Sequence, residues 1–167
     1  YPVLYPAPTP MIVDTARLEA DAAAVPDLVW SQGPEFNQRI VHEIGREQTR
    51  VDLVAYRLTD AGVADALIQK FRQGVPVRVI IEPEQYLSRT WPEYWLTHAN
   101  VDRLWAAGIP IRERAHDGLT HMKMLVTSSY ATNASSNFSV NWQRDHNWFV
   151  SAAERPAAYQ ALRGRFD

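Results

Sequence analysis

His121 and Lys123 stand two positions apart in the segment HMKMLVT, at the start of an apolar run that is typical of a β-strand. Residues at positions i and i+2 of a strand project from the same face, so we expect both side chains in one site. A neutral imidazole is a nucleophile or general acid near neutral pH, and an ammonium group can hold a phosphoryl oxygen as a point charge. The pair therefore predicts phosphate chemistry, with a structural or surface role as the alternative.

Ser135 and Asn137 repeat the same spacing a short distance downstream. They supply a hydroxyl and an amide, two groups that can hydrogen-bond to the same kind of anion. Two polar pairs that suit one phosphate are a stronger signal than either pair alone. We expect all four side chains to converge at one edge of a sheet.

The segment HMKMLVT followed by NASSNFS resembles the His-x-Lys signature of the phospholipase D superfamily. In that signature an Asp follows the lysine after four residues, and a Gly-Ser-x-Asn sequence comes later. Residues 51–82 and 104–114 precede the signature in the usual order for one half of the fold. Residues 26–167 as a whole resemble such a half.

The resemblance implies an α/β fold, an α/β/α sandwich with a mixed central sheet. It implies that His121 is the nucleophile or the acid, that Lys123 holds the phosphate, and that Ser135 and Asn137 are its polar partners. No metal or other cofactor is implied, because two lysines and the polar pairs stabilise the developing charge.

The family also implies a partner. Two His-x-Lys motifs meet across a pseudo-twofold axis, where one histidine forms a phosphohistidine and the other protonates the leaving alcohol. One imidazole cannot do both at once, so we expect a second half, from the same polypeptide or from a homodimer. The implied substrate is a phospholipid or another phosphodiester; nucleic acid is possible but is not indicated by charge.

The sequence departs from the family pattern at several positions. Ser128 stands where the motif has Asp, Ala134 replaces the Gly, and the segment between them is one residue short. Trp148 occupies the position of a Glu that hydrogen-bonds the histidine, and Asp145 is the nearest acid. We therefore assign His121 the acid role, and we keep two alternatives open: a catalytically degenerate half with a structural or binding role, and a homodimeric nuclease.

The remaining histidines have no partner at a useful spacing. His42 is expected on a solvated helix face, and His98 and His116 are expected at the surface. His146 is expected at a strand end, bonded to backbone, with a role in lining the pocket as the alternative.

Two carboxylates and one aromatic segment remain. Glu82 and Glu84 follow a predicted strand at the ligand-binding edge, where they would contact a substrate hydroxyl or be solvated. Residues 84–95 suit either a substrate-binding flap or a small satellite core.

Strand and helix patterns alternate along the chain, and strand patterns then cluster, which predicts a mixed sheet with helices on both faces. The expected strands are 28–31, 51–58, 75–82, 109–114, 123–127, 131–135 and 146–151. The expected helices are 34–48, 59–74, 95–108 and 154–166.

The composition fits one domain of residues 26–167 after a proline-rich arm or linker of residues 1–25. The 167-residue chain has a net charge of −2 and no cysteine, which excludes disulfides and thiolate metal sites. No apolar run approaches the roughly 20 residues that span a bilayer, and no signal peptide is recognisable, so we expect a soluble chain of undetermined compartment. Since the arm reads as a linker from upstream sequence, a second half in the same polypeptide is the favoured partner.

Overall fold

The computed structural model describes residues 28–31, 34–87, 92–113, 117–139 and 145–167. The proline-rich arm predicted for residues 1–25 lies outside them. The described strands form one seven-stranded sheet in the order β1-β7-β6-β5-β2-β3-β4. The strands are β1 (Leu28–Ser31), β2 (Val51–Ala55), β3 (Val77–Ile81), β4 (Ile111–Glu113), β5 (Lys123–Val126), β6 (Tyr130–Ala134) and β7 (Asp145–Ser151).

The sheet is mixed. Strands β2, β3 and β4 are parallel, whereas β5, β6, β7 and β1 follow with antiparallel pairings. This arrangement brings the carboxyl ends of β2, β3, β4 and β6 to the same edge as the amino ends of β5 and β7. We call it the His121 edge, because Lys123 begins β5 opposite Ala55, the last residue of β2.

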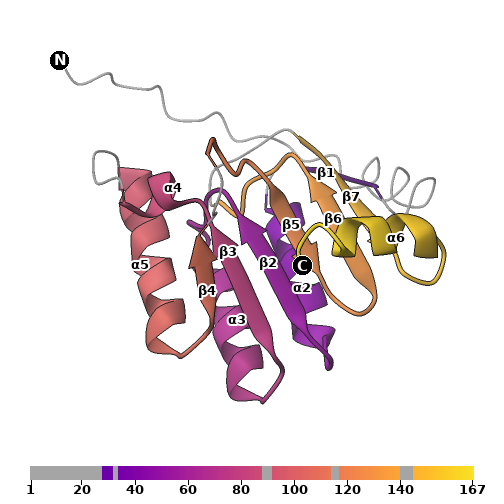
Figure 1. The fold of residues 1–167 in the computed structure, drawn as a ribbon, viewed down its shortest axis with the longest axis horizontal. Helices are drawn as coiled ribbons and strands as arrows, with labels where there is room; N and C mark the ends of the chain where they lie inside the picture. Colours follow the sequence, from indigo (N-terminus) through magenta and orange to yellow (C-terminus); the bar gives the residue numbers. More distant parts are fainter. Residues whose placement is uncertain (1–27, 32–33, 88–91, 114–116, 140–144) are drawn as a thin grey trace.

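Helices cover both faces of the sheet (Figure 1). Helices α2 (Glu35–Arg46), α3 (Ala61–Arg72) and α5 (Pro92–Ala106) lie on one face, and α6 (Pro156–Arg163) lies on the other. A short helix, α4 (Pro83–Leu87), follows β3. The architecture is therefore the α/β sandwich with a mixed sheet that the sequence predicts.

The larger core lies between the sheet and the three-helix layer. Its members are apolar side chains spaced three or four apart on the helices and two apart on the strands, among them Ile40, Leu53, Leu67, Leu104 and Leu125, all fully buried. Burial of this kind contributes roughly 1.5–3 kcal/mol for each large side chain. The larger core thus fixes the middle of β2 and β5, the two strands that lead to the His121 edge.

A smaller core lies under α6. It contains Val54, Met124 and Val126 from the sheet, with Tyr159 and Phe166 from the C-terminal segment. Strand β2 is buried along its whole length because it faces both cores.

The predicted strands and helices are all present, most of them slightly shorter than expected. Gly74 and Gly108 end helices α3 and α5 with φ of 85° and 87°, a conformation that glycine adopts without strain. Helix α4 was not predicted, because five residues are too few to show a helical period. None of the helices in the described ranges is both long and apolar enough to cross a membrane.

Candidate active site

His121 and Lys123 are in direct contact at the start of β5. The Lys123 Nζ atom lies 3.0 Å from both Nδ1 and Nε2 of His121. Lys123 is only 5% exposed, whereas the imidazole is exposed to solvent. A neutral imidazole has one nitrogen that can accept a hydrogen bond, so the ammonium donates to the unprotonated nitrogen.

The electrostatics of this pair favour a neutral imidazole. Partial burial lowers the pKa of His121, and the positive charge of Lys123 lowers it further. Burial also lowers the pKa of Lys123; the charge of Asp145 opposes this effect, and that of Arg57 adds to it. At neutral pH one ring nitrogen therefore stays unprotonated, as a nucleophile requires.

Tyr56, the first residue after β2, holds the imidazole from the side. Its ring meets the His121 ring edge-on at a centroid distance of 4.5 Å, and Lys123 Nζ lies 5.3 Å from the centre of the tyrosine ring. The Tyr56 hydroxyl accepts a hydrogen bond of 3.0 Å from Nε2 of Gln85, a buried residue of α4. Arg57 donates from Nε to Oε1 of the same Gln85. The strand pattern predicts a ligand-binding position at the turn after Tyr56, but it does not predict the contact between Tyr56 and His121.

The segment after β6 is joined to the start of β7. Ser135 donates from its hydroxyl toward Asp145 Oδ1 at 2.9 Å and the His146 carbonyl oxygen at 3.1 Å. Ser136 donates toward Asp145 Oδ2, and Asn147 binds both the N–H and the hydroxyl of Ser136. Asp145 therefore binds this segment through hydrogen bonds, and its negative charge also acts on Lys123, where it raises the lysine pKa.

Asn137 is half-buried in the same segment. The carbonyl oxygen of the next residue, Phe138, accepts hydrogen bonds from the N–H groups of Thr59 and Asp60 at 2.8 and 3.1 Å. The segment that carries Ser135 and Asn137 is thereby attached to the one that follows β2. Both polar pairs lie at the His121 edge, and the Ser135 hydroxyl is directed at Asp145. Their convergence on one phosphate stays a prediction.

Glu82 corrects a prediction. Its side chain is fully buried at the end of β3, where Oε2 accepts from the Thr120 N–H at 2.7 Å and Oε1 accepts from the Glu84 N–H. It is neither solvated nor open to a substrate, and it holds the backbone directly before His121. Glu84 is exposed.

Ser128 lies at the opposite edge of the sheet, beyond the far end of β5. The five residues from Lys123 to Ser128 extend roughly 16 Å along the strand direction, so the position of the motif Asp does not reach the histidine. The Ser128 N–H and hydroxyl donate to Oε2 of Glu47 at 2.6 and 2.8 Å. A carboxylate is thus present at this point, but it comes from the segment after α2.

Trp148 also lies apart from the candidate site residues of β7. Its side chain is 41% exposed, whereas its neighbour on the strand, Asn147, is fully buried and binds Ser136. Successive side chains on a strand alternate between faces, so Asp145 and Asn147 share one face and Trp148 occupies the other. The carboxylate on the site-facing side of β7 is Asp145.

The other histidines have ordinary surroundings. His42 is exposed on α2, as predicted, and His146 is exposed near the start of β7. His98 is half-buried, in contrast to the predicted surface position: Nε2 lies 3.2 Å from Asp102, and the ring stacks on Tyr86. His116 lies outside the described residues.

The segment 84–95 is in part helical. It contains most of α4 and the start of α5, with residues 88–91 outside the described ranges. Residues 84–87 are therefore helical and not a loop, and the choice between a flap and a satellite core stays open.

Comparisons with known proteins identify the family to which this fold belongs. Residues 40–167 match the family model described as the PLD-like domain of cardiolipin synthase, where PLD stands for phospholipase D. The chain belongs to the PLD-like family. No curated protein matches the sequence. The match makes this chain a domain of the PLD-like phosphodiesterase and phosphotransferase superfamily.

Solved structures of this PLD-like fold are similar at low sequence identity. Nuc from Salmonella typhimurium, a phospholipase D family member, aligns with a TM-score of 0.67 at 18% identity, over 83% of this chain and 90% of that one. NucT from Helicobacter pylori aligns at 0.54 and 13%, over 78% and 88%. Phosphatidylserine synthase from Haemophilus influenzae aligns at 0.60 and 12%, over 83% of this chain but 36% of that one. The PLD-like fold thus occurs in chains of about this length and as one part of a longer chain.

Proposed function

We propose that this domain supplies one half of a phosphodiesterase or phosphotransferase site, with His121 as the attacking group. The contact between Lys123 Nζ and the His121 ring carries the proposal. A buried cation in contact with a neutral imidazole supports the proposal, because one phosphate bound beside them would contact both.

In the proposed reaction, the unprotonated ring nitrogen of His121 attacks phosphorus. The bond from phosphorus to the leaving oxygen breaks, and a second histidine donates its proton to that oxygen, which leaves as an alcohol. Water, or an acceptor alcohol, then attacks the phosphohistidine while the second histidine takes up the proton. Lys123 transfers its hydrogen bond from the imidazole to a phosphate oxygen as the substrate binds.

The nucleophilic role revises the acid role expected from the sequence. That expectation depended on Ser128 and Trp148, and neither side chain lies with His121. The low pKa of His121 favours the deprotonated ring in the free protein, which suits an attacking group better than a proton donor.

The phosphate would be bound by Lys123 with Asn137 and the segment around Ser135. Asp145 would hold that segment and balance the positive charge of Lys123 and Arg57. The substrate class we propose is a phosphodiester, either of a lipid or of a nucleic acid.

A second His-x-Lys motif completes the proposed site, either from another half of a longer polypeptide or from a second copy of this chain. If two copies form the site, activity per chain rises with protein concentration and follows the dimer fraction in sedimentation. Constant activity in the 167-residue chain sedimenting as a monomer, which carries a single His-x-Lys motif, would reject the two-motif requirement.

Hydrolysis of bis(p-nitrophenyl) phosphate by the full-length protein tests the function. His121→Ala should abolish turnover, and His42→Ala, which removes an exposed histidine of α2, should leave it unchanged. Unchanged turnover in His121→Ala would favour the degenerate, structural half over an enzyme.

A further inference from the structure

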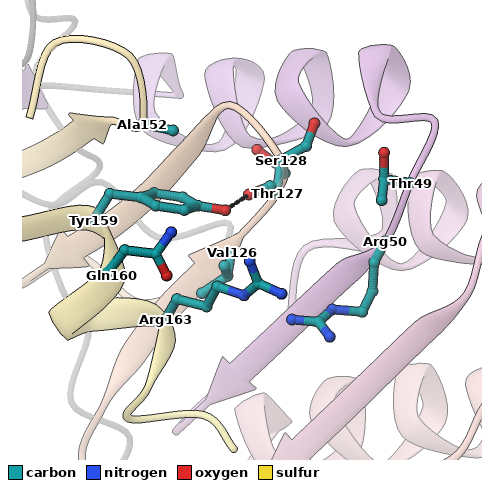
Figure 2. Close-up of a pocket in the computed structure, with 9 residues that line it drawn as sticks. All are labelled: Thr49, Arg50, Val126, Thr127, Ser128, Ala152, Tyr159, Gln160 and Arg163. Atoms are coloured by element: carbon teal, nitrogen blue, oxygen red, sulfur yellow. Dashed lines mark hydrogen bonds between the residues drawn. The ribbon is translucent and has the colours of Figure 1, made fainter. Parts of the chain in front are cut away.

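A polar cavity lies at the edge of the sheet opposite to His121. It has a volume of about 370 Å³ and lies between the start of β2, the end of β5 and helix α6 (Figure 2). Cavities of this size hold small molecules. The site proposed above does not use it.

Two guanidinium groups extend into this cavity from different elements. Arg50 directly precedes β2, and Arg163 lies in the last turn of α6. Figure 2 shows their side chains turned toward one another. Like charges that converge on an open space repel each other, and an anion bound between them would relieve that repulsion.

The two arginines differ in how they are already engaged. Arg50 uses Nε in an ion pair of 2.7 Å with the buried Asp52, and no further side-chain interaction of Arg50 occurs in the described ranges. Its terminal nitrogens face the cavity (Figure 2). Arg163 is half-buried, and within the residues that the structure describes no hydrogen bond or ion pair engages its guanidinium.

The nearby carboxylates already have hydrogen-bond or ion-pair partners, and of the two cavity arginines only Arg50 is among them. Glu47 accepts five hydrogen bonds, from the N–H groups of residues 48–50 and from both donors of Ser128. Asp52 binds Arg50 and Arg78, and Asp167 binds Arg78. None of these carboxylates binds Arg163.

The rest of the cavity wall suits a small organic group. Val126, Ala152 and the ring of Tyr159 provide apolar surface, and Gln160 adds an amide. The Tyr159 hydroxyl donates to the Thr127 carbonyl oxygen, which fixes the ring. The cavity wall therefore combines two guanidinium groups with an adjacent uncharged surface.

We propose that this cavity binds a phosphomonoester, with the phosphate between Arg50 and Arg163 and the organic part against Val126 and Tyr159. Guanidinium groups match phosphate oxygens through paired, charge-assisted hydrogen bonds. The phosphomonoester comes either from a small soluble molecule or from a lipid headgroup.

Titration with glycerol 3-phosphate, followed by NMR of the backbone amides of Ser128 and Gln160, tests the site. We expect saturable shifts in the wild type, with inorganic phosphate binding more weakly and glycerol not at all. Arg163→Gln should weaken binding at least about tenfold. Arg72→Gln is the matched control, because Arg72 is an exposed arginine of α3 whose side chain makes no hydrogen bond or ion pair among the described residues, and it lines a different groove.

Vesicles of phosphatidylcholine with and without phosphatidic acid separate the two sources. Cosedimentation that requires phosphatidic acid and Arg163 identifies a lipid headgroup, and NMR binding without cosedimentation identifies a soluble ligand. Shifts confined to the surroundings of His121, equal weakening by Arg72→Gln, or no binding in either assay would overturn the proposal. Gln160→Ala provides a second variant that leaves the arginines in place, and it should also weaken binding.

Discussion

Glu47 accepts hydrogen bonds from both the N–H and the hydroxyl of Ser128, at the opposite end of β5 from His121. The family motif has an Asp at the serine position. In this chain the carboxylate belongs to Glu47, in the segment after α2, and it accepts hydrogen bonds from the turn after β5. The departure from the motif therefore concerns a contact between the turn after β5 and the segment after α2, at the edge of the sheet opposite to His121.

Glu47→Gln should destabilise the fold by about 1–3 kcal/mol, because an amide cannot accept at both positions. Burial opposes ionisation of Glu47, but hydrogen bonds from Ser128, Thr49 and Arg50 outweigh it and lower the pKa. A lowered folded-state pKa means that this stabilisation is present above the ordinary glutamate value of 4.5 and is lost as the pH falls through the folded pKa. Urea unfolding at neutral and acidic pH measures it, with the exposed Glu84→Gln as the control.

A charge swap tests the same relationship. Ser128→Asp should destabilise the protein, since two carboxylates would then share one set of donors. Adding Glu47→Gln to Ser128→Asp should recover stability relative to Ser128→Asp alone. Additive effects in this double-mutant cycle would show that the two positions are not coupled.

Lys123→Met should abolish turnover while changing the free energy of unfolding by less than about 1 kcal/mol. Burial penalises the ammonium, so an apolar side chain of similar length replaces it at little cost. Turnover with bis(p-nitrophenyl) phosphate and urea unfolding are measured on the same variant. Lys123→Arg should also impair turnover, because a planar guanidinium has a different donor geometry; wild-type activity in either variant would contradict a phosphate-binding role.

The His121 ring should titrate below its ordinary value of 6.5. Lys123→Met should raise the His121 pKa, because it removes a neighbouring positive charge, although burial still keeps it low. NMR titration of the imidazole measures both values, and Arg72→Met should leave the titration unchanged. A lower His121 pKa in Lys123→Met would contradict the electrostatic account.

Tyr56 should act as a positioning residue for the imidazole. Tyr56→Phe keeps the ring against His121 and removes the hydroxyl that accepts from Gln85, so kcat should stay within about threefold of the wild type. Tyr56→Ala removes the ring contact and should lower kcat about tenfold or more, because a small displacement of an attacking group is costly. Equal rates in the two variants would rule out the positioning role.

The sequence predicts most of the fold because its apolar residues recur at the spacings typical of strands and helices. The alternation in Val77–Ile81 and the helical spacing of Phe36, Ile40 and Ile44 both correspond to observed burial. The sequence also predicts that His121 and Lys123 lie together, since they are two apart at a strand start. These relationships join residues close together in the sequence, so their spacing is enough to predict them.

The rest of the candidate site depends on contacts between distant segments. Gln85 reaches Tyr56 from a helix too short to predict, and Glu82 binds Thr120 from 38 positions away. The replacement of the motif Asp by Glu47 joins residues 81 positions apart. No spacing rule in one sequence reveals such pairs, because they depend on the order of the strands.

Trapping of the covalent intermediate tests the central claim most directly. The full-length protein is mixed with a phosphodiester that it hydrolyses, quenched within one turnover in alkali, and digested for mass spectrometry of the peptide that contains His121. The account predicts an acid-labile phosphoryl adduct on His121 that is absent in His121→Ala and present in His42→Ala. Turnover with no adduct on His121, or with the adduct on another residue, would contradict it.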